Sequence, residues 1–148
     1  AREVAKDYSV PMKEILVDNM AMQMVMNPAQ FDVIVTENLY GDILSDLGAG
    51  LIGGLGMIPG MNKGKDMAIY ESVHGSAPDI QGKGIANPTA MLLTSCLMLD
   101  DMGEGASAEK IRRAVYDVLS NPDTRTADLG GKLSTEDYVR ALIERVGE

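Results

Sequence analysis

The chain has 148 residues, about one ordinary domain, and its 45% hydrophobic and 24% charged residues are typical of a globular protein rather than a disordered one. Its 13 Lys and Arg residues against 22 Asp and Glu residues give a formal net charge of -9, which disfavours nucleic acid and anionic membrane surfaces as partners because both select basic patches. No apolar run approaches the roughly 18 residues of a membrane span, and the N-terminus lacks the basic start and long apolar stretch of a secretory signal.

The first part of the chain predicts a strand at 13–17 followed by a helix at 19–26. Met, Ala and Gln favour helix, Asp18 is a suitable N-cap, and Asn27 followed by Pro28 ends the helix. Methionines at alternating positions point around the whole helix, so we expect it to be covered on most sides by another subunit. An ordinary core helix in a monomer is the alternative.

The next segment predicts a second strand and helix. Residues 31–36 are short and β-branched, which indicates a buried strand, and the apolar spacing of 39–51 is that of one helix face. Eight glycines and Pro59 fall within 41–64. Such a cluster predicts that the chain crosses here between two packed units.

The second half of the chain predicts one more strand and three helices. Asn87 followed by Pro88 is typical of a helix start, and Ser107 and Ser134 are expected to cap the two later helices. Strands that alternate with helices predict an α/β fold with much parallel sheet. The expected elements are a strand at 67–73 and helices at 88–102, 108–120 and 135–146.

Two carboxylates lie four residues apart on the predicted 39–51 helix. Asp42 and Asp46 therefore share one helix face, where like charges destabilise a helix by a few tenths of a kcal/mol. A divalent cation would remove this repulsion, and oxygen ligands favour Mg²⁺ or Mn²⁺. A solvated acidic face is the alternative, but the pair directly follows a predicted buried strand, where open α/β sheets bind ligands.

Residues 48–53 match the pattern Gly-x-Gly-x-x-Gly. The dinucleotide fingerprint needs a strand before this pattern and a helix that opens from it. Here the pattern follows a helix, so we interpret it as part of the crossing between units.

The only histidine opens a glycine-containing loop at 74–88. His74 follows a predicted strand, and such a loop can offer backbone N–H groups to phosphate. Asp79 is suited to bind two ribose hydroxyls and would repel a 2′-phosphate. Nucleotide binding is therefore one hypothesis for this loop, beside an ordinary surface or core histidine.

The single cysteine, Cys96, lies in an apolar run. It excludes an internal disulfide and is expected to pack as a small hydrophobic residue. This cysteine usage predicts an intracellular protein.

Four segments in the same order resemble the β-decarboxylating dehydrogenases, the family of isocitrate, homoisocitrate, 3-isopropylmalate and tartrate dehydrogenases. They are 38–47 (NLYGDILSDL), 71–79 (ESVHGSAPD), 84–88 (GIANP) and 126–131 (TADLGG). The resemblance implies the α/β isocitrate/isopropylmalate dehydrogenase-like fold. Residues 1–52 then correspond to the C-terminal part of the small domain, which holds the metal and the dimer interface, and 53–148 to that of the large, NAD-binding domain.

The resemblance also implies the metal ligands. Asp42 and Asp46 match the residues that hold Mg²⁺ or Mn²⁺ against the substrate, with Asp42 taken as the catalytic one. Asp18 matches a third carboxylate, which the family donates across a dimer interface. A homo-oligomer, with the methionine-rich helix at the interface, is therefore expected.

The nucleotide-binding residues follow from the same resemblance, and NAD is the expected cofactor. Relatives that use NADP tend to carry Lys and Tyr where this chain has Asp79 and Ile80. The matched residues are Glu71 near the nicotinamide, His74, Gly75, Ser76 and Ala77 along the adenosine and pyrophosphate, Asp79 at the ribose and Asn87 at the adenine.

The implied reaction is metal-assisted hydride transfer from C2 of a 2-hydroxy acid to NAD⁺, followed by loss of the β-carboxylate as CO₂. Isocitrate, converted to 2-oxoglutarate as in the tricarboxylic acid cycle, is the expected substrate, because isopropylmalate enzymes tend to have Phe and Pro in place of Tyr40 and Ser72. Homoisocitrate and 3-isopropylmalate are alternatives. The expected location is the cytoplasm, or the mitochondrial matrix in a eukaryote.

The chain resembles only the C-terminal part of such an enzyme. The family's catalytic Lys and Tyr motifs are not found in it, so the 148 residues alone are expected to be inactive. A non-catalytic regulatory subunit and an assembly module without ligand are the competing hypotheses. The complete set Asp18, Asp42, Asp46 and Asp79 argues against a regulatory role.

Overall fold

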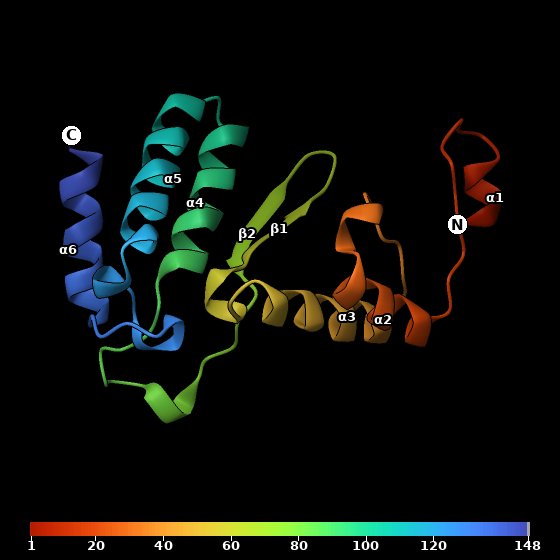
Figure 1. The fold of residues 1–148 in the computed structure, drawn as a ribbon. Helices are drawn as coiled ribbons and strands as arrows, with labels where there is room; N and C mark the ends of the chain where they lie inside the picture. The colour runs from red at the N-terminus through yellow and green to blue at the C-terminus, as the bar shows by residue number, and fades with distance from the viewer. Residues whose placement is uncertain (148) are drawn as a thin grey trace. The chain divides into compact units, whose positions relative to one another are not determined.

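The computed structural model describes residues 1–147 and forms two compact units (Figure 1). The first unit is Ala1–Leu51, and the second begins at Ile52. The boundary falls inside the glycine cluster that predicted a crossing between units. Both helical and strand segments are present, and none of the helices within residues 1–147 is long and apolar enough to span a membrane.

The first unit contains three helices, α1 (Arg2–Ala5), α2 (Val17–Met26) and α3 (Asn38–Leu51). Helices α2 and α3 contact each other, and a Cβ at Gly48 would lie 3.6 Å from Met24 Cε. Helix α2 is capped by Leu16 without a side-chain bond, so Asp18 lies in its first turn rather than at the cap. Only Met20 of this helix is buried within the chain.

Two strands expected in this unit are absent, and both predictions were wrong. Residues 13–16 and 31–37 form neither helix nor strand, and residue 17 already belongs to α2. A strand needs a neighbour that completes its hydrogen-bond ladder, and no segment of residues 1–147 pairs with either of these. Val33 and Val35, which predicted a buried strand, are each 80% exposed.

The sheet is a two-stranded hairpin in the second unit. Strands β1 (Pro59–Lys63) and β2 (Ala68–Ser72) are antiparallel, and Gly60 lies opposite Glu71. A Cβ at Gly60 would lie 2.5 Å from the Glu71 carbonyl oxygen, so a side chain at this position would displace the backbone.

The expected parallel sheet is therefore absent from residues 1–147, where the only parallel pairing is an isolated bridge between Thr126 and Leu133. Sequence alternation predicts a strand but not the direction of its partner, which depends on contacts far along the chain. Strand β1 was not predicted at all, since Pro-Gly-Met-Asn-Lys contains no β-branched residue.

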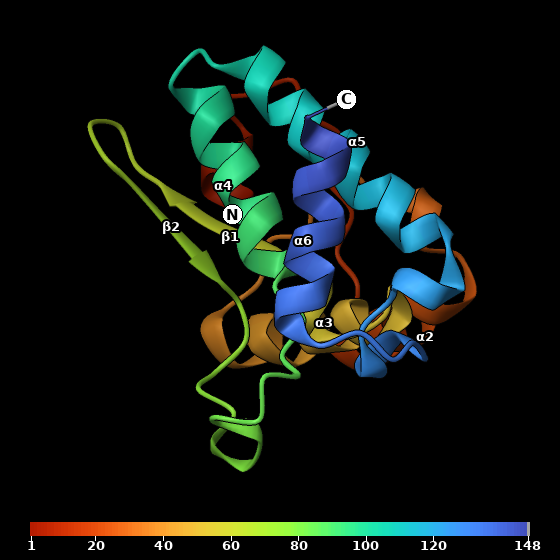
Figure 2. The same cartoon turned by 90° about the vertical axis from the view of Figure 1, so that its left-hand side faces the viewer.

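Three helices make the core of the second unit: α4 (Thr89–Asp101), α5 (Gly105–Ser120) and α6 (Thr135–Val146), which lie side by side (Figures 1 and 2). All three were predicted, but α5 begins three residues earlier than expected, with Glu104 rather than Ser107 at its N-cap. The hydroxyl of Ser134 caps α6 as predicted, because its Oγ accepts a hydrogen bond from the Asp137 N–H at 3.1 Å.

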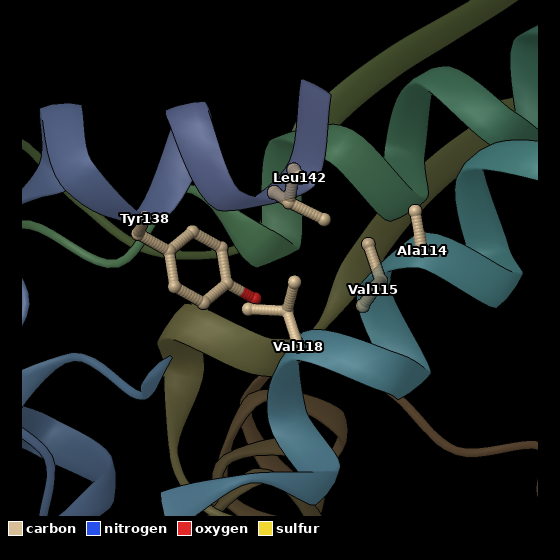
Figure 3. Close-up of a cluster of buried hydrophobic side chains, with 5 residues drawn as sticks. All are labelled: Ala114, Val115, Val118, Tyr138 and Leu142. Carbon is tan, nitrogen blue, oxygen red and sulfur yellow. The ribbon is translucent and has the colours of Figure 1, made fainter. Parts of the chain in front are cut away.

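The core between α5 and α6 is small and closely packed. Figure 3 shows Tyr138 and Leu142 of α6 pointing toward Val115 and Val118 of α5. Burying a side chain of this size stabilises a fold by about 1.5–3 kcal/mol. Tyr138 is fully buried, and its hydroxyl lies 2.7 Å from the Oγ1 of Thr89, which is also fully buried. The first residue of α4 is thereby joined to α6.

The hairpin is attached to α4 through buried and exposed contacts. The Thr94 hydroxyl accepts a hydrogen bond from the Gly60 N–H and donates one to the Glu71 carbonyl, both at 3.2 Å. At the C-terminal end of α4, Asp101 accepts hydrogen bonds from Lys63 Nζ and the Tyr70 hydroxyl, both at 2.6 Å. One helix thus holds both strands.

Removing the Tyr138 hydroxyl tests the buried link. Tyr138→Phe leaves the Thr89 hydroxyl without a partner in a dry site, so we expect it to lower the free energy of unfolding by about 1–3 kcal/mol. The double variant Tyr138→Phe/Thr89→Val removes both polar groups and should cost less than the sum of the single changes. Urea unfolding measures each variant. If the losses in unfolding free energy of the two single variants simply add up in the double variant, the two hydroxyls are not coupled and this account is contradicted.

The Asp101 contacts predict a dependence on acid. Hydrogen bonds from Lys63 and then from Tyr70 lower the pKa of Asp101 from its usual 3.8. A carboxyl whose pKa is lower in the folded state stabilises the fold above its unfolded pKa, and this contribution is lost as the pH falls below 3.8. The difference in unfolding free energy between the wild type and Asp101→Asn should therefore shrink between pH 5 and 2. A difference that is the same at every pH would contradict this account.

Candidate functional site

A cavity of about 560 Å³ lies within the second unit. Its walls come from residues 55–56, from most of 74–87 and from Asp128. Figure 2 shows the segment around the turn Pro78–Ile80 leaving the end of β2 and returning to the start of α4. The size is typical of ligand pockets, and the aliphatic side chains and glycine backbone of the walls suit a flat, partly apolar ligand.

Five of the residues predicted to bind a nucleotide line this cavity together. They are His74, Gly75, Ser76, Ala77 and Asn87. Four of them follow directly after β2 and Val73 in the chain, and the fifth precedes α4. The hairpin and the helix therefore hold the two ends of the loop that surrounds the cavity.

The backbone of the loop is strained at one of these positions. Ala77 has φ 44°, in the left-handed region that favours glycine. Such a conformation costs of order 1–3 kcal/mol and is most often found at ligand sites. Three residues earlier, His74 is exposed, and its Nδ1 lies 3.0 Å from the Gly75 carbonyl oxygen.

The side chain of Asn87 is fixed by its neighbours. Its Nδ2 donates to Asp128 Oδ2 at 2.9 Å, and its Oδ1 accepts from the Thr89 N–H at 3.0 Å. The second bond supplies a partner to one of the free N–H groups at the start of α4. A Cβ at Gly56 would lie 3.3 Å from both the Asn87 and Asp128 side chains, so glycine leaves room for this pair.

Asp128 is a cavity residue that the sequence pattern did not predict. It falls in the 126–131 segment that carried the resemblance, but its spacing from Asn87, 41 residues along the chain, gives no indication of contact. Its carboxylate is the only acidic side chain on the cavity wall within residues 1–147.

Two other predicted nucleotide residues do not line the cavity. Asp79 is exposed on the 3₁₀ turn Pro78–Ile80, whereas Ala77, just before the turn, and Ile80, its last residue, are both on the wall. Glu71 is on β2, where its Oε1 accepts a hydrogen bond from Asn62 at 3.0 Å.

The predicted metal ligands lie in the first unit. Asp42 and Asp46 are exposed on α3, one turn apart, and Asp18 is exposed in the first turn of α2. None of the three forms an ion pair with residues 1–147, and no three acidic, His or Cys side chains of the described chain gather into a metal site. Two exposed carboxylates fit part of a Mg²⁺ or Mn²⁺ shell, whose remaining ligands need another source.

The glycine pattern at 48–53 forms no phosphate loop. Gly48 and Gly50 lie inside α3, and Gly53 has φ 117° just after the helix ends. A dinucleotide fingerprint would place these glycines between a strand and the first turn of a helix. The structure therefore supports the interpretation of this pattern as part of the connection between units.

Cys96 is fully buried on α4. Burial raises the pKa of its thiol, which keeps the sulfur protonated and weakly nucleophilic. This confirms that the cysteine packs as a small hydrophobic residue.

Comparisons with known proteins match almost the whole chain. The isocitrate/isopropylmalate dehydrogenase family matches residues 1–142. Isocitrate/homoisocitrate dehydrogenase of Thermus thermophilus is 56% identical over 144 residues, which are 97% of this chain and 43% of that protein. A 3-isopropylmalate dehydrogenase of Archaeoglobus fulgidus is 51% identical over 142 residues, 95% of this chain and 43% of that protein.

A solved structure gives the same result. The crystal structure of isocitrate dehydrogenase from Methylococcus capsulatus superimposes with a TM-score of 0.92 at 50% identity, covering 99% of this chain and 44% of that one. The chain thus spans less than half the length of the relatives it matches. On the strength of the family match and of this likeness, the chain belongs to the isocitrate/isopropylmalate dehydrogenase family and has the fold of its C-terminal portion.

Proposed function

We propose that the protein carrying this chain is an NAD-dependent, metal-dependent β-decarboxylating dehydrogenase that converts isocitrate to 2-oxoglutarate. The observation that carries the proposal is the cavity, because its wall is built from the same loop residues that the sequence assigned to a nucleotide, 74–77 and Asn87. The family membership of the chain supplies the reaction class.

The cavity fits the adenosine part of NAD. In this proposal the aliphatic and glycine walls hold the flat base, and residues 74–77 follow the pyrophosphate with their backbone. Asp79, on the turn beside the wall, binds the ribose hydroxyls and repels the 2′-phosphate of NADP. Glu71 is assigned to the nicotinamide end.

Asp42 and Asp46 are proposed to hold Mg²⁺ or Mn²⁺, with Asp18 supplied by a second copy of the chain. The spacing of the pair on α3 suits a shared cation. No third acidic, His or Cys side chain of residues 1–147 gathers with the pair, so in this proposal the third carboxylate comes from another chain. We therefore propose a homo-oligomer with the methionine-rich α2 at its interface, where Met22 and Met26 are 50% and 72% exposed in a single chain.

Each part of the chain then has a distinct task. We assign residues 1–52 to the small domain, which binds the metal, and 53–148 to the large domain, which binds NAD. When bound, NAD⁺ accepts the hydride and the cation acts as a Lewis acid toward the C2 oxygen. The residues of this chain bind and orient these groups. The Lys and Tyr that transfer protons in the family have no counterpart here, so turnover is proposed to need residues beyond this set.

The names of the relatives indicate three candidate substrates. The Thermus thermophilus relative is named for both isocitrate and homoisocitrate, and the Archaeoglobus fulgidus relative for 3-isopropylmalate. Tyr40 and Ser72 favour isocitrate or homoisocitrate by the resemblance. Turnover of the three acids by the full-length protein, with NAD⁺ and Mn²⁺, decides among them, and no turnover of any would refute the enzyme proposal.

A regulatory subunit is the second candidate function. A regulatory subunit of Dictyostelium discoideum and a catalytic subunit of Arabidopsis thaliana are each 48% identical to this chain. Overall identity therefore does not separate the two roles. The set of carboxylates at positions 18, 42 and 46 favours catalysis, because a subunit that only binds an effector has no need of all three.

Removing the proposed metal ligands tests this choice. Asp46→Asn and Asp42→Asn should each weaken Mn²⁺ binding by roughly tenfold or more, as changes outside the first ligand shell already cost about 10–100-fold. Titration calorimetry of the full-length protein measures this effect. Asp32→Asn, an exposed carboxylate of the same unit, is the matched control. Full activity of a holoenzyme reconstituted with the Asp42→Asn chain would favour the regulatory role.

A substitution of Asp79, on the turn Pro78–Ile80, tests the proposed preference for NAD over NADP. Asp79→Ala removes hydrogen bonds between a carboxylate and the ribose, which are worth about 1.5–3 kcal/mol, so NAD⁺ affinity should fall by about 10–100-fold. NADP⁺ affinity should fall less or rise. Asp117→Ala, at an exposed position on α5, is the control and should leave both affinities unchanged. An equal loss for both nucleotides would exclude Asp79 as the selecting residue.

A further inference from the structure

The part of the cavity wall at 84–87 has no secondary structure of its own. It belongs to no helix or strand, and Gly84 has φ 63°, so its backbone follows no regular pattern. The conformation of such a segment depends on contacts with neighbouring elements. One end is held through the Asn87 side chain, as described above.

The backbone hydrogen bonds of this segment come from a single residue of α6. The Thr135 N–H donates to the Gly84 carbonyl at 2.8 Å, and the Thr135 hydroxyl donates to the Ala86 carbonyl at 2.6 Å. Thr135 is the first residue of α6, where backbone N–H groups have no partner inside the helix. Both of its donors are used on the cavity wall.

Thr135 is itself rigidly held. It directly follows the N-cap Ser134, and one turn later Tyr138 is fully buried against α5 and bonded to Thr89. The hydroxyl therefore extends from a packed helix to a segment without regular structure, where its hydrogen bond can fix the conformation of that segment.

The bond to Ala86 also orients the next peptide group. In a trans peptide the C=O and the following N–H point in opposite directions, so the Asn87 N–H points away from the Thr135 hydroxyl. This N–H makes no hydrogen bond with residues 1–147. It remains available as a donor, and both Ala86 and Asn87 lie on the cavity wall.

We propose that Thr135 is a positioning residue for the nucleotide site: its hydroxyl fixes the Ala86–Asn87 peptide and so the wall of the cavity. This inference rests on the proposed function, because it takes NAD as the ligand of the cavity. The positioning role of Thr135 rests only on its two hydrogen bonds and on the packing of α6.

Thr135→Val in the full-length protein tests the proposal. Valine keeps the shape and the backbone N–H but deletes the hydroxyl. We expect the Kd for NAD⁺ to rise about fivefold to tenfold, which corresponds to the loss of one hydrogen bond. The amide hydrogens of Ala86 and Asn87 should also exchange faster in the nucleotide-free protein. Thr135→Ser retains the donor and should restore both properties.

Thr124→Val is the matched control. Its hydroxyl also donates to a backbone carbonyl, that of Val118, but it does not line the cavity. We expect a change in stability without a change in the Kd for NAD⁺ or in the exchange at residues 86 and 87. If Thr135→Val does not fold, Thr135→Cys, whose thiol is a weak donor, replaces it.

The outcomes separate this proposal from the proposed function. If the wild type binds NAD⁺ and Thr135→Val binds it equally well with unchanged exchange, the positioning role is wrong. If the wild type binds no NAD⁺, the proposed function fails. Hydrogen exchange at residues 86 and 87 in the nucleotide-free protein then decides alone whether Thr135 positions the cavity wall.

Discussion

The hydrogen bond between Thr89 and Tyr138 is the contact on which the second unit depends. Both side chains are fully buried, so each hydroxyl would lose its hydration without a replacement if the other were absent. The bond joins α4 to α6 at their N-terminal ends. These ends flank the cavity, because Asn87 lies two residues before Thr89 and Thr135 lies three residues before Tyr138.

The wall of the cavity is thus a loop that is held in place by packed helices. Asn87 is held by Asp128 and by the start of α4, and residues 84–86 are held by the start of α6. Binding residues on a loop over a rigid scaffold are a common arrangement, since the loop tolerates the strain and close approach that a ligand requires. Ala77, with its left-handed backbone, is the strained position of this loop.

The helices were largely predictable because their determinants are local. Apolar spacing and the Ser134 cap are read within one or two turns, and all five predicted helices are present, with shifts of at most three residues at their ends. Strands depend on partners that sequence spacing does not identify, which is why 13–17 and 31–36 were predicted wrongly and β1 was missed. The same limit applies to the site, since Asp128 and Thr135 reach the cavity across 41 and 49 residues.

The two proposed binding functions differ in what a single chain supplies. The cavity is formed within the second unit, so the groups proposed to bind a nucleotide already lie together. The carboxylates of the first unit are exposed and do not form a cluster of three within residues 1–147. Under the proposed function, nucleotide binding is therefore a property of one folded unit, whereas metal binding is a property of the assembly, because bringing Asp18 of a second copy to Asp42 and Asp46 depends on association as well as on folding.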